Sequence, residues 1–175
     1  MLYNSTQNAK EVVSAAQAIA QGISKDGGLF VPQEFPKYDE NTFKALLKTD
    51  YKGRAKKVFS DFLSDFTEEE ISDCVEKAYT AQKFGGENPA PISYCNLDGT
   101  TLNILELWHG PTCAFKDMAL QILPHLLTKS LKKKYDGKTV KYLAQVCQTP
   151  QAGKGAFVPG RFAMTCCVQD IQFVG

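Results

Sequence analysis

The chain has 175 residues, of which 43% are apolar and 22% charged, and a formal net charge of +1. This composition is ordinary for a globular protein, and the charge favours neither a nucleic-acid nor a membrane-surface partner. No apolar run reaches membrane-spanning length, the N-terminus lacks a signal-peptide core, and the six cysteines form no CxxC pair. We therefore expect a cytoplasmic protein without a metal site.

Residues 1–89 are predicted to form a mainly helical N-terminal domain. Apolar residues recur at helical spacing in four stretches, namely 12–23, 43–47, 55–66 and 71–79. Thr67 and Glu70 have the spacing of a capping box in front of the last stretch. Short extended pieces are expected at residues 3–6 and 29–31, the second of which is closed by a proline.

Sheet formation is predicted to begin near residue 90. Residues 83–91 are rich in Gly and Pro and should end the helical region. Two apolar runs, 92–97 and 102–107, then flank Asp98-Gly99, which is a strong signal for a β-hairpin.

A helix is predicted to follow the second run and to begin near Ala114, after a turn at residues 109–112 that contains Gly and Pro. Pro124 should kink this helix unless the first helical piece ends there. Residues 140–147 then have the pattern of another strand. The order strand, turn, helix, strand predicts a parallel sheet in an α/β domain over residues 90–147.

One lysine, Lys116, stands at the predicted helix start, next to the turn at 109–112. A cation in the first turn opposes the helix dipole, so helix stability does not explain its position. Its apolar neighbours Phe115, Met118 and Ala119 favour the neutral, nucleophilic form of the amine. By itself this leaves two interpretations of Lys116: a solvated lysine, or one that forms a Schiff base with an aldehyde cofactor.

Two motifs carry a resemblance to a known family. Residues 109–119, HGPTCAFKDMA, resemble the lysine motif of threonine synthases, which bind pyridoxal phosphate (PLP). Residues 24–32, SKDGGLFVP, and residues 3–6, YNST, resemble the opening of the same family. The resemblance covers residues 3–144 and implies a fold-type II, tryptophan-synthase-β-like α/β lobe of which this chain holds only the start.

The resemblance also implies a reaction and a site. Threonine synthases are lyases that convert O-phospho-L-homoserine and water to L-threonine and phosphate, the final step of threonine biosynthesis. Lys116 would hold the cofactor and move protons, which makes it the expected catalytic residue. Thr112 and His109 would shape the cofactor pocket, and Asp117 would order the lysine or cap the helix. The expected partner is this small-molecule substrate, and oligomerisation stays open.

The resemblance ends near Ala144. Where the family has a Ser/Thr-Gly-rich loop for the cofactor phosphate, residues 148–155 read QTPQAGKG, and their proline removes a backbone donor. Residues 148–175 have poor periodicity and are predicted to be an irregular tail. We therefore expect a truncated or altered gene product. Two alternatives to a threonine synthase remain: an inactive fragment that serves as an interaction module, and a phospholyase that eliminates phosphate without forming threonine.

Overall fold

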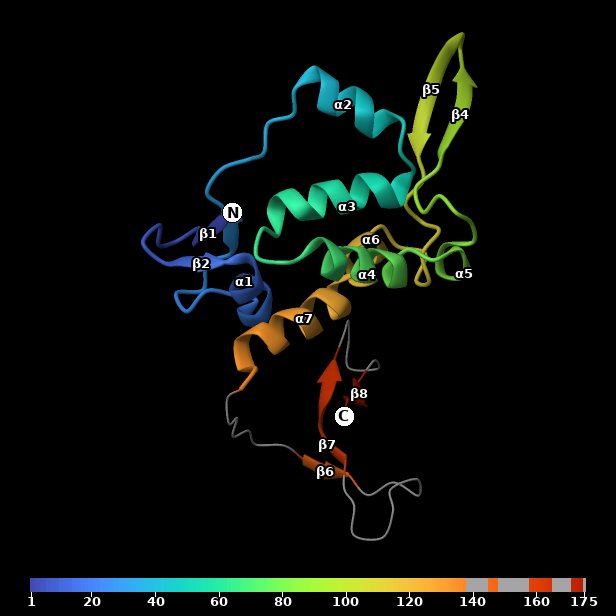
Figure 1. Ribbon diagram of the computed structural model, residues 1–175. Helices are drawn as coiled ribbons and strands as arrows, with labels where there is room; N and C mark the ends of the chain where they lie inside the picture. The colour runs from blue at the N-terminus through green and yellow to red at the C-terminus, as the bar shows by residue number, and fades with distance from the viewer. Residues whose placement is uncertain (138–144, 148–157, 165–170, 175) are drawn as a thin grey trace. The chain divides into compact units, whose positions relative to one another are not determined.

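The computed structural model describes residues 1–137, 145–147, 158–164 and 171–174 of the chain (Figure 1). It divides into two compact units, Met1–Asp136 and Gly137–Gly175. The predicted boundary near residue 89 lies inside the first unit and stays a prediction. The last helix of this unit packs against helices from the N-terminal part of the chain.

The chain begins with a small antiparallel sheet of order β2-β1-β3, formed by β1 (Leu2–Ser5), β2 (Val12–Ser14) and β3 (Phe30–Pro32). The helix predicted from residue 12 begins three residues later. Its N-cap is Ser14, whose hydroxyl accepts the Gln17 N–H in a capping box. The two β-branched valines before this cap pair with β1 instead.

Five helices follow the first two strands, namely α1 (Ala15–Gln21), α2 (Glu40–Leu47), α3 (Tyr51–Phe62), α4 (Glu68–Ala78) and α5 (Ala81–Phe84). Side chains of Asp39, Asp50 and Thr67 accept backbone N–H groups at the starts of α2, α3 and α4. The capping box predicted from Thr67 and Glu70 is confirmed.

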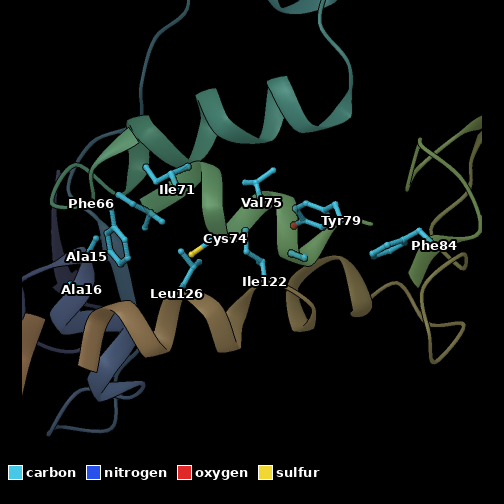
Figure 2. Close-up of a cluster of buried hydrophobic side chains, with 12 residues drawn as sticks. Ala15, Ala16, Phe66, Ile71, Cys74, Val75, Tyr79, Phe84, Ile122 and Leu126 are labelled. Atoms are coloured by element: carbon cyan, nitrogen blue, oxygen red, sulfur yellow. The ribbon is translucent and has the colours of Figure 1, made fainter. Parts of the chain in front are cut away.

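The core of the first unit lies around α4, which contacts both α3 and α7 (Leu123–Tyr135). Ile71, Cys74 and Val75 of α4 are 0–2% exposed. In Figure 2, Cys74 points toward Ile122 and Leu126, whereas Ile71 and Val75 lie on the side of α4 that faces α3. Ion pairs flank this core on both sides of α4. Glu76 pairs with Lys52 and Lys56 of α3, and Glu70 and Asp73 pair with Lys133 and Lys129 of α7.

The predicted hairpin is confirmed as β4 (Ile92–Leu97) paired antiparallel with β5 (Thr100–Leu105). Asp98 and Gly99 at its tip both have positive φ, 49° and 81°, as the tight hairpin turn requires. Most apolar side chains of these two strands are exposed.

The helical segment after the turn is divided. A short helix, α6 (Asp117–Leu120), ends before Ile122, and Pro124 lies in the first turn of α7. A proline at that position needs no backbone donor, so the chain starts a new helix there instead of kinking one.

The second unit contains three strands, β6 (Gln145–Cys147), β7 (Val158–Met164) and β8 (Ile171–Val174). They form an antiparallel sheet of order β6-β7-β8, so the prediction of an irregular tail over 148–175 is wrong for the described strands. Three- to seven-residue strands are too short to show a clear period, and their pairing partner identifies them instead.

The α/β class is confirmed, whereas the predicted parallel pairing is not found among the described strands. Each of them pairs antiparallel with its partner. Three of these pairs join strands that follow one another in the sequence, namely β4–β5, β6–β7 and β7–β8. Short connections favour antiparallel pairs, since parallel strands need a long crossover. The first part of the predicted strand 140–147 lies outside the described residues.

Candidate functional site

The turn that leads from β5 to α6 is closed by its own backbone. The N–H of Cys113 donates to the Gly110 carbonyl over 3.0 Å, and the N–H of Asp117 donates to the Ala114 carbonyl over 3.0 Å. Between these bonds Cys113 has a φ of 53°, which is in the left-handed region that residues with a side chain disfavour. The turn therefore has one defined and locally disfavoured conformation.

Asp117 is the polar centre of this turn and is 0% exposed. Its Oδ2 accepts two hydrogen bonds from Thr112, one from the backbone N–H at 2.8 Å and one from the hydroxyl at 2.9 Å. Burial raises the pKa of the Asp117 carboxyl, but interactions with Thr112, Ala114 and Gln121 together outweigh it and hold this pKa below its usual range. The buried carboxylate is thus ionised at neutral pH.

Lys116 directly precedes α6, with a helical φ of −62° and no side-chain cap. Its side chain is exposed. The helix behind it is attached to the core, because the hydroxyl of Tyr79, the residue that caps the C-terminus of α4, donates to the Met118 carbonyl over 2.7 Å. An exposed lysine therefore stands on a backbone that is held from two sides, by Asp117 and by Tyr79.

Lys116 lines an open groove of about 910 Å³ in the first unit. The walls are mostly apolar and come from α2, α3, the hairpin and the start of α6. They include Leu47, Arg54, Leu105 and Phe115. The amine therefore borders an apolar surface large enough for a small aromatic ligand, and Arg54 contributes a second positive charge to the same groove.

His109 and Thr112 are not among the residues that line this groove in the described part of the chain. His109 Nε2 lies 2.6 Å from Glu106 Oε2, and its ring stacks on Trp108 with 5.7 Å between centroids. The hydrogen bond from His109 holds the pKa of the Glu106 carboxyl below its usual range. The hydroxyl of Thr112 donates to Asp117. A cofactor-binding role for either residue stays a prediction.

Sequence reasoning missed two partners in this site. Glu106 was not singled out, although a carboxylate three residues before a histidine is a readable signal for a pair. Tyr79 was expected only as the last apolar residue of the helical stretch 71–79. Its bond to Met118 joins positions 39 apart in the sequence, and no local pattern predicts that.

Metal and membrane chemistry receive no support from the described residues. No group of three or more His, Cys, Asp or Glu side chains there is placed to hold a metal ion. Within the same part of the chain, we find no helix with the length and hydropathy needed to cross a bilayer.

Comparison with known proteins identifies the family. Residues 2–79 match the family model described as "Threonine synthase N terminus". Threonine synthase of Escherichia coli (strain K12) is 37% identical over 127 residues, which is 73% of this chain and 27% of that protein. Threonine synthase-like 2 of Mus musculus is 33% identical over 142 residues, 80% of this chain and 28% of the relative.

Solved structures agree. The PLP-bound threonine synthase of Brucella melitensis superimposes with a TM-score of 0.69 at 30% identity, over 77% of this chain and 28% of that one. Yeast threonine synthase gives a TM-score of 0.69 at 31% identity, over 76% of this chain and 27% of its own. Residues 2–79 therefore belong to the threonine synthase family, as its N-terminal part, and the similarity to its members extends over about three quarters of this chain.

The match has two limits. The chain spans about 27% of the length of the relatives it matches. Residues 120–175 match a second family model, described as "DUF1980 C-terminal domain". The segment after Ala144, which departs from the threonine synthase pattern, therefore has a family match of its own.

Proposed function

We propose that this chain carries the cofactor lysine of a PLP-dependent threonine synthase, which converts O-phospho-L-homoserine and water to L-threonine and phosphate. One observation carries the proposal: Lys116 is an exposed lysine directly before α6 and lines an apolar groove. An alignment over 127 of 175 residues includes Lys116 wherever it begins, so the lysine lies in the part shared with E. coli threonine synthase.

The residues present fit PLP. An aldehyde requires a primary amine, which Lys116 supplies, and a pyridine ring requires apolar walls such as Phe115 and Leu105 of the groove. Arg54 lines the same groove and supplies positive charge, which a phosphate group requires. These three features lie in one unit of the structure, so they do not depend on the second unit.

PLP, when bound, supplies an electron sink for carbanion chemistry. The part of the chain is to hold the cofactor and to move protons. The Nζ of Lys116 would do both, first as the attachment point and then, once released, as general base and acid. The carboxylate of Asp117 is buried and accepts two hydrogen bonds from Thr112, so it is not placed to exchange protons with a substrate.

The test is a titration of the purified chain with PLP, followed by borohydride reduction and peptide mapping. We expect saturable labelling of Lys116 that Lys116→Ala abolishes. Lys132→Ala, which removes an exposed lysine near the end of α7, is the matched control and should leave the labelling unchanged. Labelling spread over the lysines of α7, with no saturable site, would refute the proposal.

A second candidate is an interaction module without catalytic activity, and the match of residues 120–175 to a different family favours it. This candidate predicts no PLP adduct on Lys116.

A related phospholyase is the third candidate. It predicts the adduct, but with phosphate release from O-phosphohomoserine in the absence of threonine, which product analysis resolves. A cytoplasmic location and an oligomeric state stay predictions.

A further inference from the structure

The contact between Asp117 and Thr112 joins the two ends of the segment that carries Lys116. Both donors of Thr112, its N–H and its hydroxyl, point at one oxygen of Asp117, at 2.8 and 2.9 Å. We refer to this pair as the 112–117 clasp. The four residues between Thr112 and Asp117 are enclosed by it, so Lys116 cannot change its backbone direction without opening the clasp.

The backbone at Gly110 lies very close to the side chain of Asp117 in the clasp. A Cβ added to Gly110 would lie 2.4 Å from the Cβ of Asp117 and 2.6 Å from its Oδ2. Atoms at those distances overlap, and the partner is a buried side chain that has no room to withdraw. The turn therefore fits only against glycine, and Asp117 is enclosed on this side as well.

The clasp also holds a disfavoured backbone conformation. Cys113, with a φ of 53°, lies between Thr112 and Lys116. Such a residue persists where surrounding contacts over-determine it. Two hydrogen bonds to a buried carboxylate on one side, and the bond from Tyr79 to Met118 on the other, provide those contacts.

We propose that Asp117 is a positioning residue that acts on Lys116 through Thr112: the clasp keeps the segment closed and sets the direction in which the amine enters the groove. The inference rests on the proposed function of Lys116 and adds a requirement to it. Asp117 does not touch the reacting atoms, so its loss should change where the amine lies and leave its chemical nature intact.

The experiment uses Thr112→Val, which removes the hydroxyl and keeps the backbone donor, with Thr112→Ser as the conservative variant that retains both. Thr128→Val is the matched control, because the hydroxyl of Thr128 donates to a carbonyl of its own helix on the surface. Asp117→Asn is the second variant at the other end of the clasp.

The first readout is independent of the cofactor. Amide hydrogen exchange of Cys113 and Asp117, both of which donate within the turn, reports whether the segment opens. The loss of a hydrogen bond to a charged group should raise the equilibrium constant for opening of the segment about tenfold. We expect about tenfold faster exchange at these amides in Thr112→Val and Asp117→Asn, and wild-type exchange in Thr112→Ser and Thr128→Val.

The second readout is the rate at which PLP and borohydride label Lys116, relative to labelling by trinitrobenzenesulfonate, which needs no groove. Thr112→Val should lower the PLP rate about tenfold at an unchanged trinitrobenzenesulfonate rate, and Thr112→Ser should restore it. A clasp with a purely structural role would lower the urea midpoint and leave the ratio of the two rates unchanged, which would overturn the proposal. Unchanged exchange at Cys113 and Asp117 would also overturn it. If wild-type protein gives no PLP adduct, the proposed function fails, and the exchange readout still decides whether the clasp holds the turn.

Discussion

The hydroxyl of Tyr79 is the point where the core and the lysine-bearing segment meet, and its removal is the most informative single change. Tyr79 is 3% exposed, and its Oη lies 2.7 Å from the Met118 carbonyl oxygen on α6. Burial raises the pKa of this hydroxyl, so it stays protonated and donates throughout the neutral range. Tyr79→Phe keeps the ring, which packs edge-on against Tyr51 with 5.0 Å between centroids, and removes only the hydroxyl, which also interacts with the hydroxyl of Tyr51.

The magnitude follows from the contact. A typical hydrogen bond contributes about 1 kcal/mol net, and a carbonyl left without its partner in a partly buried place costs about 1–3 kcal/mol. We expect Tyr79→Phe to lower the free energy of unfolding of the first unit by about 2 kcal/mol. With a urea dependence of about 2 kcal/mol per molar, the midpoint should fall by about 1 M.

The assay is urea unfolding followed by the fluorescence of Trp108, the single tryptophan of the chain, which lies one residue before His109 in the site. Tyr94→Phe is the matched control, since Tyr94 is 73% exposed on the hairpin, and its change should stay within about 0.5 kcal/mol. Equal midpoints for the two variants would refute the view that α4 anchors α6 through this bond.

Three further predictions concern the same unit. Ile71→Val removes one methylene from a side chain that is 2% exposed and should cost about 1 kcal/mol in urea unfolding. Thr67→Ala removes the hydroxyl that caps α4 and should also cost about 1 kcal/mol, measured by circular dichroism during thermal unfolding. Hydrogen bonds from Lys52 and then Lys56 hold the pKa of Glu76 below its ordinary value of 4.5. A depressed folded-state pKa stabilises the fold above the unfolded value, so this contribution is present above about pH 4.5 and is lost as the pH falls through the folded value. The urea midpoint should therefore fall less between pH 6 and pH 3 in Glu76→Gln than in the wild type.

Each of these predictions has a control and a contrary outcome. Ile92→Val changes a side chain that is 54% exposed, and it should lower the free energy of unfolding by much less than Ile71→Val does. Thr101→Ala, on the exposed hairpin, controls for the loss of a threonine hydroxyl. Glu87→Gln removes a carboxylate that forms no ion pair in the described part of the chain, and the urea midpoint of this variant should respond to pH as that of the wild type does. If a variant and its control change the measured quantity equally, the stabilising role assigned to the corresponding contact is wrong.

Much of the local structure could be predicted from the sequence, because it depends on neighbours along the chain. Thr67 and Glu70 cap α4 as their spacing indicates, and Asp98-Gly99 turns the hairpin because both residues accept a positive φ. The buried face of α4 follows the helical period of its apolar residues. The lysine of the site could be singled out, because it follows a Gly-Pro turn and precedes a helix.

Tertiary structure decided which strands pair and what surrounds Lys116. The antiparallel strands of the second unit have partners that no local pattern predicts, so a period search reads them as irregular. The burial of Asp117 under Gly110 and the anchoring of α6 by Tyr79 depend on residues brought together by folding. The sequence by itself determined most of the elements of the first unit and singled out Lys116 as a candidate. Only the tertiary structure decided how that lysine is held, because hydrogen bonds and steric contacts between distant residues are properties of the folded chain.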